Sequence, residues 1–270
     1  MPTILFTAGA KGGTGKSTAV RFLITYLRDH GADPLLLDLD DENRTLSRFF
    51  TEDLQVEIKK KSSHDILVER ALKGDSLIIA DLKAGTGREV LDWWLDVPFE
   101  ELQFQGVGFI CLASVTSSPD SVQSFLNWVT ALEDRVRYVV FRNHKDGDYL
   151  PDYDKSDGAL SFRETFRPHH VVIPRLDEEY VTELERLDLT IAEVLDSSNG
   201  ISGSGQEQRT GTLPAYGEGA ASPLPAGNLR SARRHPGASV YAHEQTGKRN
   251  MNAPEAQRAL FNDLVADLLD

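Results

Sequence analysis

The sequence predicts an α/β fold in which a doubly wound, mostly parallel sheet is flanked by helices. Short apolar runs alternate with helical patterns from residue 3 to about residue 195, and this alternation is typical of βαβ units. Most of the apolar runs are continuous, as expected for strands that are covered on both faces. The expected strands are Thr3–Ala8, Pro34–Leu39, Leu77–Leu82, Val107–Ala113, Arg137–Arg142 and His170–Pro174.

Helices between these strands have recognisable ends. The first should end at Gly31, because glycine favours the position just after a helix. A second is expected over residues 64–73 with Ser63 as its cap, and a third begins at Ser118 and Pro119. The tryptophans lie in helical patterns and are expected to pack in the core or against the sheet: Trp93, Trp94 and Trp128.

Composition divides the 270 residues into three segments. Residues 1–196 are expected to form the α/β domain, and residues 197–237, rich in Gly, Ser, Pro and Ala, a flexible insertion. Residues 238–270 should end in an amphipathic helix that docks on the domain or on a second subunit. A membrane anchor is the alternative, but such anchors carry basic residues on the polar face, and here Arg258 stands against three aspartates.

Charge and cysteine content exclude some classes of protein. The net charge of −13 disfavours contact with DNA or anionic lipid unless a local basic patch provides it. Cys111 is the sole cysteine, which excludes an internal disulfide and a cluster bound by several cysteines of one chain. No apolar run approaches the roughly 20 residues that span a bilayer, and the N-terminus lacks a signal-peptide pattern. We therefore expect a cytoplasmic protein.

A phosphate-binding loop follows the first expected strand and opens the first helix. Its residues are Lys11, Gly12, Gly13, Thr14, Gly15, Lys16, Ser17 and Thr18. Glycines allow consecutive backbone N–H groups to point inward, and the helix N-terminus behind them favours anions. Lys16 can reach the β- and γ-phosphates, and the Ser17 hydroxyl can bind Mg²⁺. The pattern departs from the usual phosphate loop at its first glycine, which is replaced by Ala10.

This loop resembles that of the ParA/MinD family, the ATPases with a deviant Walker A motif, which reads K-G-G-x-G-K-[ST]. The resemblance implies that Lys11 reaches across a dimer interface to the phosphates of nucleotide held by the other subunit, where an extra cation neutralises the facing charges. It therefore implies an ATP-dependent homodimer. The alternative for Lys11 is a solvated lysine beside the loop.

Three aspartates are candidates for the reaction centre. Alternation along the second strand puts Asp38 and Asp40 on one side of the chain, at the carboxyl end of the sheet. Asp81 ends the apolar run of the third expected strand, as in a Walker B element. The resemblance implies that Asp38 and Asp81 organise Mg²⁺ and that Asp40 orients the attacking water. The alternative for the pair after the second strand is an acidic turn.

The nucleotide base is expected near Asn143 and Pro174, each at the end of a strand. By the resemblance Asn143 reads adenine, and Pro174 lies where the family closes its adenine pocket. The run Asn143-His144-Lys145-Asp146 places lysine out of register for the guanine-reading motif N-K-x-D, so ATP is favoured over GTP. A strand-end asparagine that only makes a turn is the alternative.

The resemblance implies a partition or positioning ATPase that binds ATP and Mg²⁺, forms a sandwich dimer and slowly hydrolyses ATP. Residues 41–46 are similar to those of relatives encoded on plasmids and linked to stability or conjugation. An activating partner protein is expected, non-specific DNA binding is open, and membrane binding is disfavoured. The alternative is a metabolic ATP-dependent synthetase of the dethiobiotin-synthetase or cobyrinate-synthase type, which generally lacks the lysine at position 11.

Overall fold

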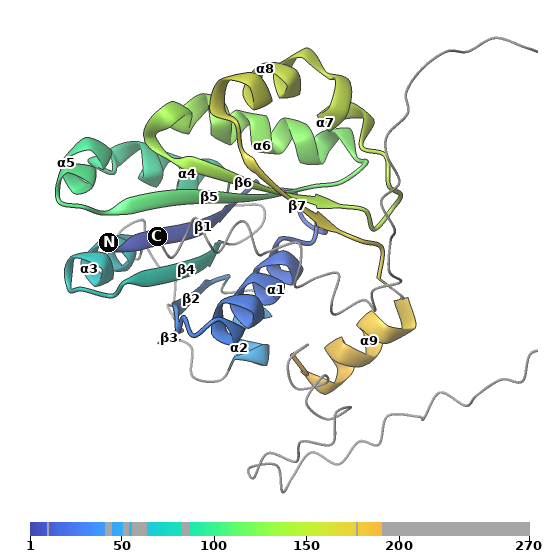
Figure 1. Cartoon of the computed structure of the whole chain (residues 1–270), viewed down its shortest axis with the longest axis horizontal. Coiled ribbons are helices and arrows are strands. Elements are labelled where there is room, and N and C mark those ends of the chain that lie inside the picture. The colour runs from blue at the N-terminus through green and yellow to red at the C-terminus, as the bar shows by residue number, and fades with distance from the viewer. Residues whose placement is uncertain are drawn as a thin grey trace, which may run out of the picture. The chain divides into compact units, whose positions relative to one another are not determined.

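Seven parallel strands form a sheet with helices on both faces, within the residues that the structure, a computed structural model, describes: 1–9, 11–40, 45–50, 54–55, 64–82, 87–176 and 178–190 (Figure 1). The strands are β1 (Thr3–Ala8), β2 (Leu35–Leu39), β3 (Leu54–Gln55), β4 (Leu77–Leu82), β5 (Gly108–Val115), β6 (Arg137–Asn143) and β7 (His169–Ile173). The helices are α1 (Lys16–Asp29), α2 (Thr45–Phe49), α3 (Asp65–Leu72), α4 (Gly87–Asp96), α5 (Phe99–Phe104), α6 (Pro119–Leu132), α7 (Pro151–Lys155), α8 (Asp157–Phe166) and α9 (Glu178–Leu187), with the short 3₁₀ helix η2 (Glu133–Arg135).

The predicted fold class is confirmed, and the six predicted strands are present with ends shifted by at most two residues. The two-residue strand β3 was missed. It pairs with β2 through Leu37 opposite Leu54, and a strand this short has no alternation from which to predict it.

The order of the strands across the sheet is β3-β2-β4-β1-β5-β6-β7, and each neighbouring pair is parallel. The chain leaves β1 toward β2 on one side, whereas it later crosses from β4 over β1 to β5. In open parallel sheets, ligands bind beyond the carboxyl ends of the strands at such a change of direction. The fold therefore places the end of β1, and the loop that follows it, at the position favoured for a site.

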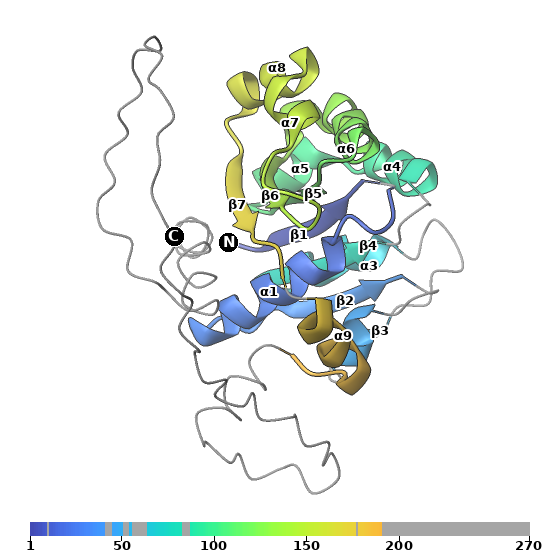
Figure 2. The same cartoon turned by 90° about the vertical axis from the view of Figure 1, so that its right-hand side faces the viewer.

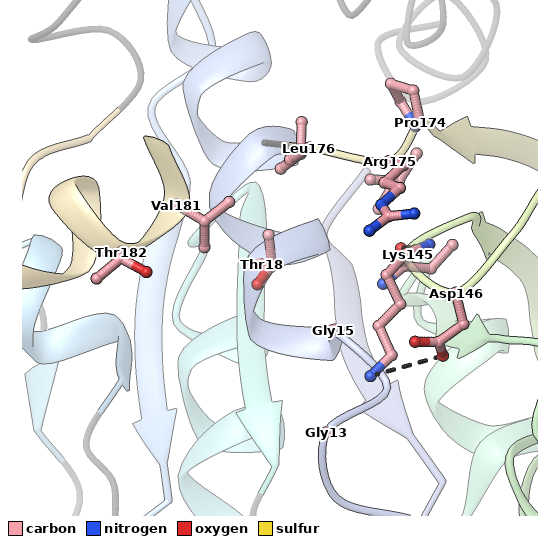
Figure 3. A pocket seen from close by; sticks show the side chains of 12 residues that line it. Gly13, Gly15, Thr18, Lys145, Asp146, Pro174, Arg175, Leu176, Val181 and Thr182 are labelled. Carbon is pink, nitrogen blue, oxygen red and sulfur yellow. Dashed lines mark hydrogen bonds and ion pairs between the residues drawn. The ribbon is translucent and has the colours of Figure 1, made fainter. Parts of the chain in front are cut away.

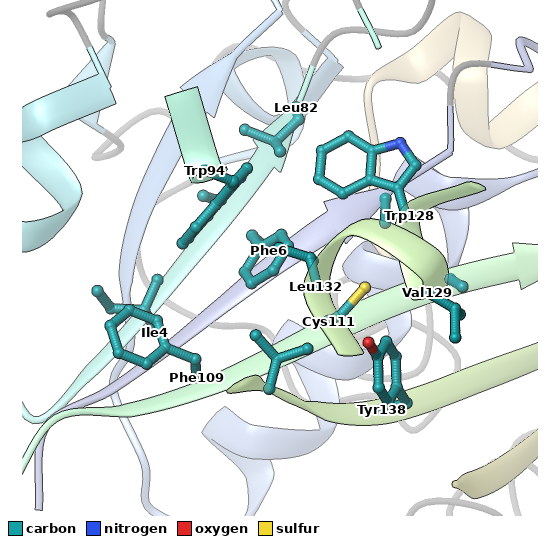
Figure 4. Packing of buried hydrophobic residues seen from close by; sticks show 14 of the residues in the cluster. Ile4, Phe6, Leu82, Trp94, Phe109, Cys111, Trp128, Val129, Leu132 and Tyr138 are labelled. Carbon is teal, nitrogen blue, oxygen red and sulfur yellow. The ribbon is translucent and has the colours of Figure 1, made fainter. Parts of the chain in front are cut away.

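Each face of the sheet has its own apolar core. On one face, α1 and α2 pack on the strands, with Leu23 and Phe49 among the buried side chains. On the other face lie α3 to α8, and Figures 1 and 2 show α4 to α8 together as a separate layer. All three tryptophans are buried there, as predicted; Trp94 stacks on Phe6 with ring centroids 3.9 Å apart (Figure 4). Successive residues of β1 pack into opposite cores: Leu5 into the core beside α1, and Phe6 into the core with the tryptophans. Strand β1 is therefore covered on both faces.

The helix ends follow the sequence signals in most cases. Gly31 has a φ of 80° just beyond α1, as the glycine signal predicts. Helix α6 begins at Pro119 after Ser118, although the Ser118 side chain makes no capping hydrogen bond. His64 occupies the N-cap of α3, and Ser63, the predicted cap, lies outside the described residues.

The predictions for residues 41–44, 197–237 and 238–270 also concern residues outside the described part of the chain. Among the residues that are described, no helix has the length and apolar character needed to cross a membrane.

Candidate nucleotide-binding site

The loop between β1 and α1 has the backbone of a phosphate cradle. Gly13 and Gly15 have φ values of 72° and 84°, and Gly15 is the N-cap of α1. These left-handed conformations are the ones that glycine adopts most readily, and they confirm the expected freedom at two of the three loop glycines; Gly12 does not have a positive φ. A Cβ atom on Gly15 would lie 2.3 Å from Nδ2 of Asn143, so a side chain there collides with β6.

Two side chains from neighbouring strands fix this loop from behind. The backbone carbonyl of Thr14 accepts hydrogen bonds from the Ser114 hydroxyl at 2.7 Å and from the Asn143 amide at 2.9 Å. All three residues are buried. Ser114 was missed in the sequence analysis, although a hydroxyl in an otherwise apolar strand is a visible signal. The loop is thus tied to the ends of β5 and β6 at a single carbonyl group.

Lys16 is a buried cation at the first position of α1, directly after the loop. Its Nζ donates to the backbone carbonyl of Lys11 at 3.0 Å. Burial lowers the pKa of Lys16, while the nearby carboxylates of Asp81 and Asp40 oppose that shift. A lysine with its charge largely desolvated binds an anion such as a phosphate more strongly than an exposed lysine does.

The predicted metal residues come together at the ends of β2 and β4. Asp38 and Asp81 are paired in the parallel register of these strands, and both are buried. Asp81 is hydrogen-bonded to the Ser17 hydroxyl, and it accepts from the Thr7 hydroxyl at 3.0 Å. Burial raises the pKa of Asp81 to about 6, with a further contribution from Asp38, and the two hydroxyls and Lys16 oppose the shift.

Asp38 is held by the chain that follows its own strand. One carboxylate oxygen accepts from the backbone N–H of Asp40, and the other accepts from both the N–H and the hydroxyl of Ser47 at 3.0 Å. Asp40 is also buried. Thr7 and Ser47, which orient the two metal-side carboxylates, were not identified from the sequence.

This arrangement fits Mg²⁺ held together with nucleotide phosphates. Among the described residues there is no group of three or more His, Cys, Asp or Glu side chains that could hold a metal by themselves. Mg²⁺ differs from metals that need such a group, because it keeps several waters and takes one or two carboxylates plus substrate phosphates. Asp38, Asp81 and the Ser17 hydroxyl supply that kind of donor set.

A cavity of about 530 Å³ continues from the loop toward β7 and α9 (Figure 3). Its lining residues are Gly13, Gly15, Thr18, Asn143, Lys145, Asp146, Ile173, Pro174, Arg175, Leu176, Val181 and Thr182. The cavity contains both residues predicted to contact the base. Its walls from α9 and from Lys145 and Asp146 were not predicted.

The amide of Asn143 is engaged on both sides by the chain itself. Besides donating to Thr14, it accepts from the backbone N–H of Lys145 at 3.1 Å. The structure therefore gives Asn143 an architectural role, joining the phosphate loop to the turn after β6. Adenine reading by Asn143 stays a prediction.

The backbone of Lys11 contacts Lys16, but its side chain makes a separate contact. Its ammonium pairs with the Asp120 carboxylate, at the start of α6, at 3.1 Å, and both side chains are largely exposed. Cys111 is a separate case. Its thiol is buried, and burial raises its pKa, which agrees with the prediction of an inert core residue.

Comparison with known protein families finds a match over the segment that contains the phosphate loop and the three aspartates. The family model for the ATPase MipZ matches residues 3–84, a segment that contains the phosphate loop, Asp38, Asp40 and Asp81. No curated protein sequence matches the chain.

Similar solved structures include two from Aquifex aeolicus: a MinC:MinD cell division protein complex (16% identity, TM-score 0.46) and the MinD cell division protein (18%, 0.46); each alignment covers 73% of this chain and 90% of that one. A third, a plasmid partition protein from Borrelia burgdorferi bound to AMPPNP, has 15% identity and a TM-score of 0.43 over 74% of this chain and 98% of that one. The family-model match covers less than half of the chain, and it makes the segment with the phosphate loop and the paired aspartates similar to that of the ATPase MipZ.

Proposed function

We propose that the chain binds ATP with Mg²⁺, closes into an ATP-dependent sandwich dimer and slowly hydrolyses ATP to ADP and phosphate. The observation that carries this proposal is the grouping of a buried lysine, Lys16, with Asp38, Asp81 and the Ser17 hydroxyl beside a glycine loop at a helix N-terminus. Such a grouping matches the positioning and charge neutralisation that phosphoryl transfer requires.

Each residue has a distinct role in this proposal. The loop, residues 12–18, cradles the phosphates with its backbone, and Lys16 neutralises charge on the β- and γ-phosphates. Ser17, Asp38 and Asp81 would hold Mg²⁺, which would offset the negative charge that develops on the phosphates. Asp40, buried near Lys16, orients the attacking water. Lys11 leaves Asp120 and completes the site of the second subunit.

The purine base occupies the cavity bounded by Asn143 and Pro174. The energy of dimer formation and hydrolysis would drive partition or positioning of DNA or another cargo, with an activating partner protein. Residues 197–237 and 238–270 are proposed as a flexible insertion and a C-terminal segment that returns to the ATPase domain or to its dimer partner. We propose a cytoplasmic protein.

The test compares oligomeric state with nucleotide. Light scattering of the Asp40→Ala variant, in which the water-orienting carboxylate is absent, should show a dimer with ATP and Mg²⁺ and a monomer with ADP. Asp33→Ala removes an exposed carboxylate elsewhere and should leave native turnover and ATP-dependent association unchanged. A monomer with ATP, accompanied by a stoichiometric phosphorylated small-molecule product, would instead support the synthetase alternative.

DNA binding is tested separately. Retention of the protein on immobilised DNA of arbitrary sequence should be weak. It should fall steeply between roughly 50 and 200 mM salt, because contacts with the DNA phosphates release counterions. Retention that is absent or insensitive to salt would remove DNA as a direct partner and leave another cargo.

A further inference from the structure

Helix α9 forms one wall of the base-side cavity. Figure 3 shows Val181 and Thr182 of α9 on one side of the cavity, with Lys145 and Arg175 on the other. Thr18, in the first turns of α1, lies between these two sides. A base in this cavity would therefore contact α9, and the position of α9 would decide how tightly the base is enclosed.

Charged contacts hold α9 to the domain, with little help from the apolar core. Among the α9 side chains that the structure describes, Leu184 alone is buried. By contrast, Arg48 of α2 makes a pair with Asp188 at 2.6 Å, donates to the Glu185 backbone carbonyl at 2.8 Å and lies 3.6 Å from the Glu185 carboxylate. One arginine thus makes two contacts with the last turn of α9 and one with the residue that follows the helix.

A second arginine reaches the same carboxylate from α1. Arg21 is buried, its Nη2 lies 2.8 Å from the Glu185 carboxylate, and its guanidinium carbon lies 3.9 Å from the centre of the Phe49 ring. Its Nη1 has no hydrogen-bond partner within the described part of the chain. A buried guanidinium that loses its carboxylate is left as an uncompensated charge, which is costly. Arg21 therefore strongly favours the conformation in which Glu185 keeps its ion pair with Arg21 and α9 stays against α1.

Ser47, the residue before Arg48, contacts the end of the nucleotide site where Mg²⁺ is proposed to bind. Ser47 donates twice to Asp38, the carboxylate proposed to organise Mg²⁺. The five-residue helix α2 therefore contacts the metal side of the site with one residue and α9 with the next.

We propose that Arg21, Arg48, Glu185 and Asp188 form an ionic clamp that holds α9 against the bound base and so sets the rate at which nucleotide leaves the site. Arg48 is a positioning residue in this clamp, because it acts on the nucleotide through α9. The proposal rests on the proposed function, since it requires that the cavity hold a nucleotide base.

The test measures release of a fluorescent ADP analogue by stopped flow. Arg48→Gln and Asp188→Asn each remove one charge of the clamp, and release should become roughly two- to fivefold faster, the range expected when partly exposed ion pairs are lost. The double variant should be little faster than Arg48→Gln alone, because Asp188→Asn acts through its pair with Arg48. Arg28→Gln is the matched control: Arg28 also lies on α1, where it pairs with Asp33 at 3.7 Å and lies over the Phe50 ring.

Release at the native rate from both Arg48→Gln and Asp188→Asn would overturn the clamp. Equal acceleration by Arg28→Gln would overturn it as well, since the effect would then be one of general charge. Thermal unfolding without nucleotide gives the unfolding midpoint of each variant and identifies variants that act through stability alone. Release is then measured at the same number of degrees below each midpoint. If the native chain binds neither ATP nor ADP, the proposed function itself fails, and this outcome is distinct from native-rate release by the variants.

Discussion

The close approach of Gly15 to Asn143 predicts a large effect for the smallest possible substitution, Gly15→Ala. The new Cβ would lie 2.3 Å from the Asn143 amide nitrogen on a backbone with a φ of 84°. The left-handed conformation costs a residue with a Cβ about 1–2 kcal/mol. Displacing the amide also breaks its buried hydrogen bond to Thr14, which costs about 1–3 kcal/mol more. We expect the free energy of unfolding to fall by roughly 2–5 kcal/mol.

Gly13→Ala is the matched control for the backbone term. Gly13 has a φ of 72°, but a Cβ there meets no atom within 4 Å, so this variant should lose only about 1–2 kcal/mol. Urea unfolding and the affinity for a fluorescent ATP analogue measure both variants. In an Asn143→Ala background the collision is absent, and Gly15→Ala should then cost about as much as Gly13→Ala. Equal losses for Gly13→Ala and Gly15→Ala in the native background would refute the steric reasoning.

Two further predictions concern charge. In protein free of metal and nucleotide, the pKa of Asp81 is raised from 3.8 to about 6, so the folded state holds this proton more firmly than the unfolded state. The free energy of unfolding should therefore fall as pH rises from about 4 to 6 and then level off, with a total loss of at most on the order of 3 kcal/mol. Urea titrations at several pH values should show no such loss from Asp81 in the Asp81→Asn variant. Identical pH profiles for the native chain and this variant would contradict the prediction. Asp120→Asn frees Lys11 from an exposed pair, and ATP-dependent dimerisation should strengthen about two- to fivefold by light scattering. Asp157→Asn, also in a first helical turn, is its control, and an equal gain there would count against a specific role for Lys11.

Much of the fold could be predicted because its signals are local. Continuous apolar runs marked six strands, and the loop glycines with Lys16 and Ser17 marked the cradle without any knowledge of strand order. Asp38 and Asp81 could likewise be recognised one strand at a time, because each ends its own apolar run.

What the sequence could not predict depends on strands meeting at long range. The register that sets Asp38 beside Asp81 follows from β4 inserting between β2 and β1. The bond from Asn143 to Thr14 joins residues 129 apart in the chain, and a strand-end asparagine carries no local mark of such a partner. The α9 wall was missed for the same reason: Glu185 and Asp188 resemble ordinary surface acids until Arg21 and Arg48 are seen to face them.

The shared anchor on Thr14 also explains how the loop presents its donors. In a planar trans peptide the carbonyl and the following N–H point in opposite directions, and the chain contains no cis peptide within its described residues. Because Ser114 and Asn143 draw the Thr14 carbonyl toward the strands, the N–H of Gly15 must point away from them, into the loop. Two buried side chains of the sheet thus fix the direction of a backbone donor that they do not touch. Preorganisation of this kind removes much of the ordering cost of binding a phosphate.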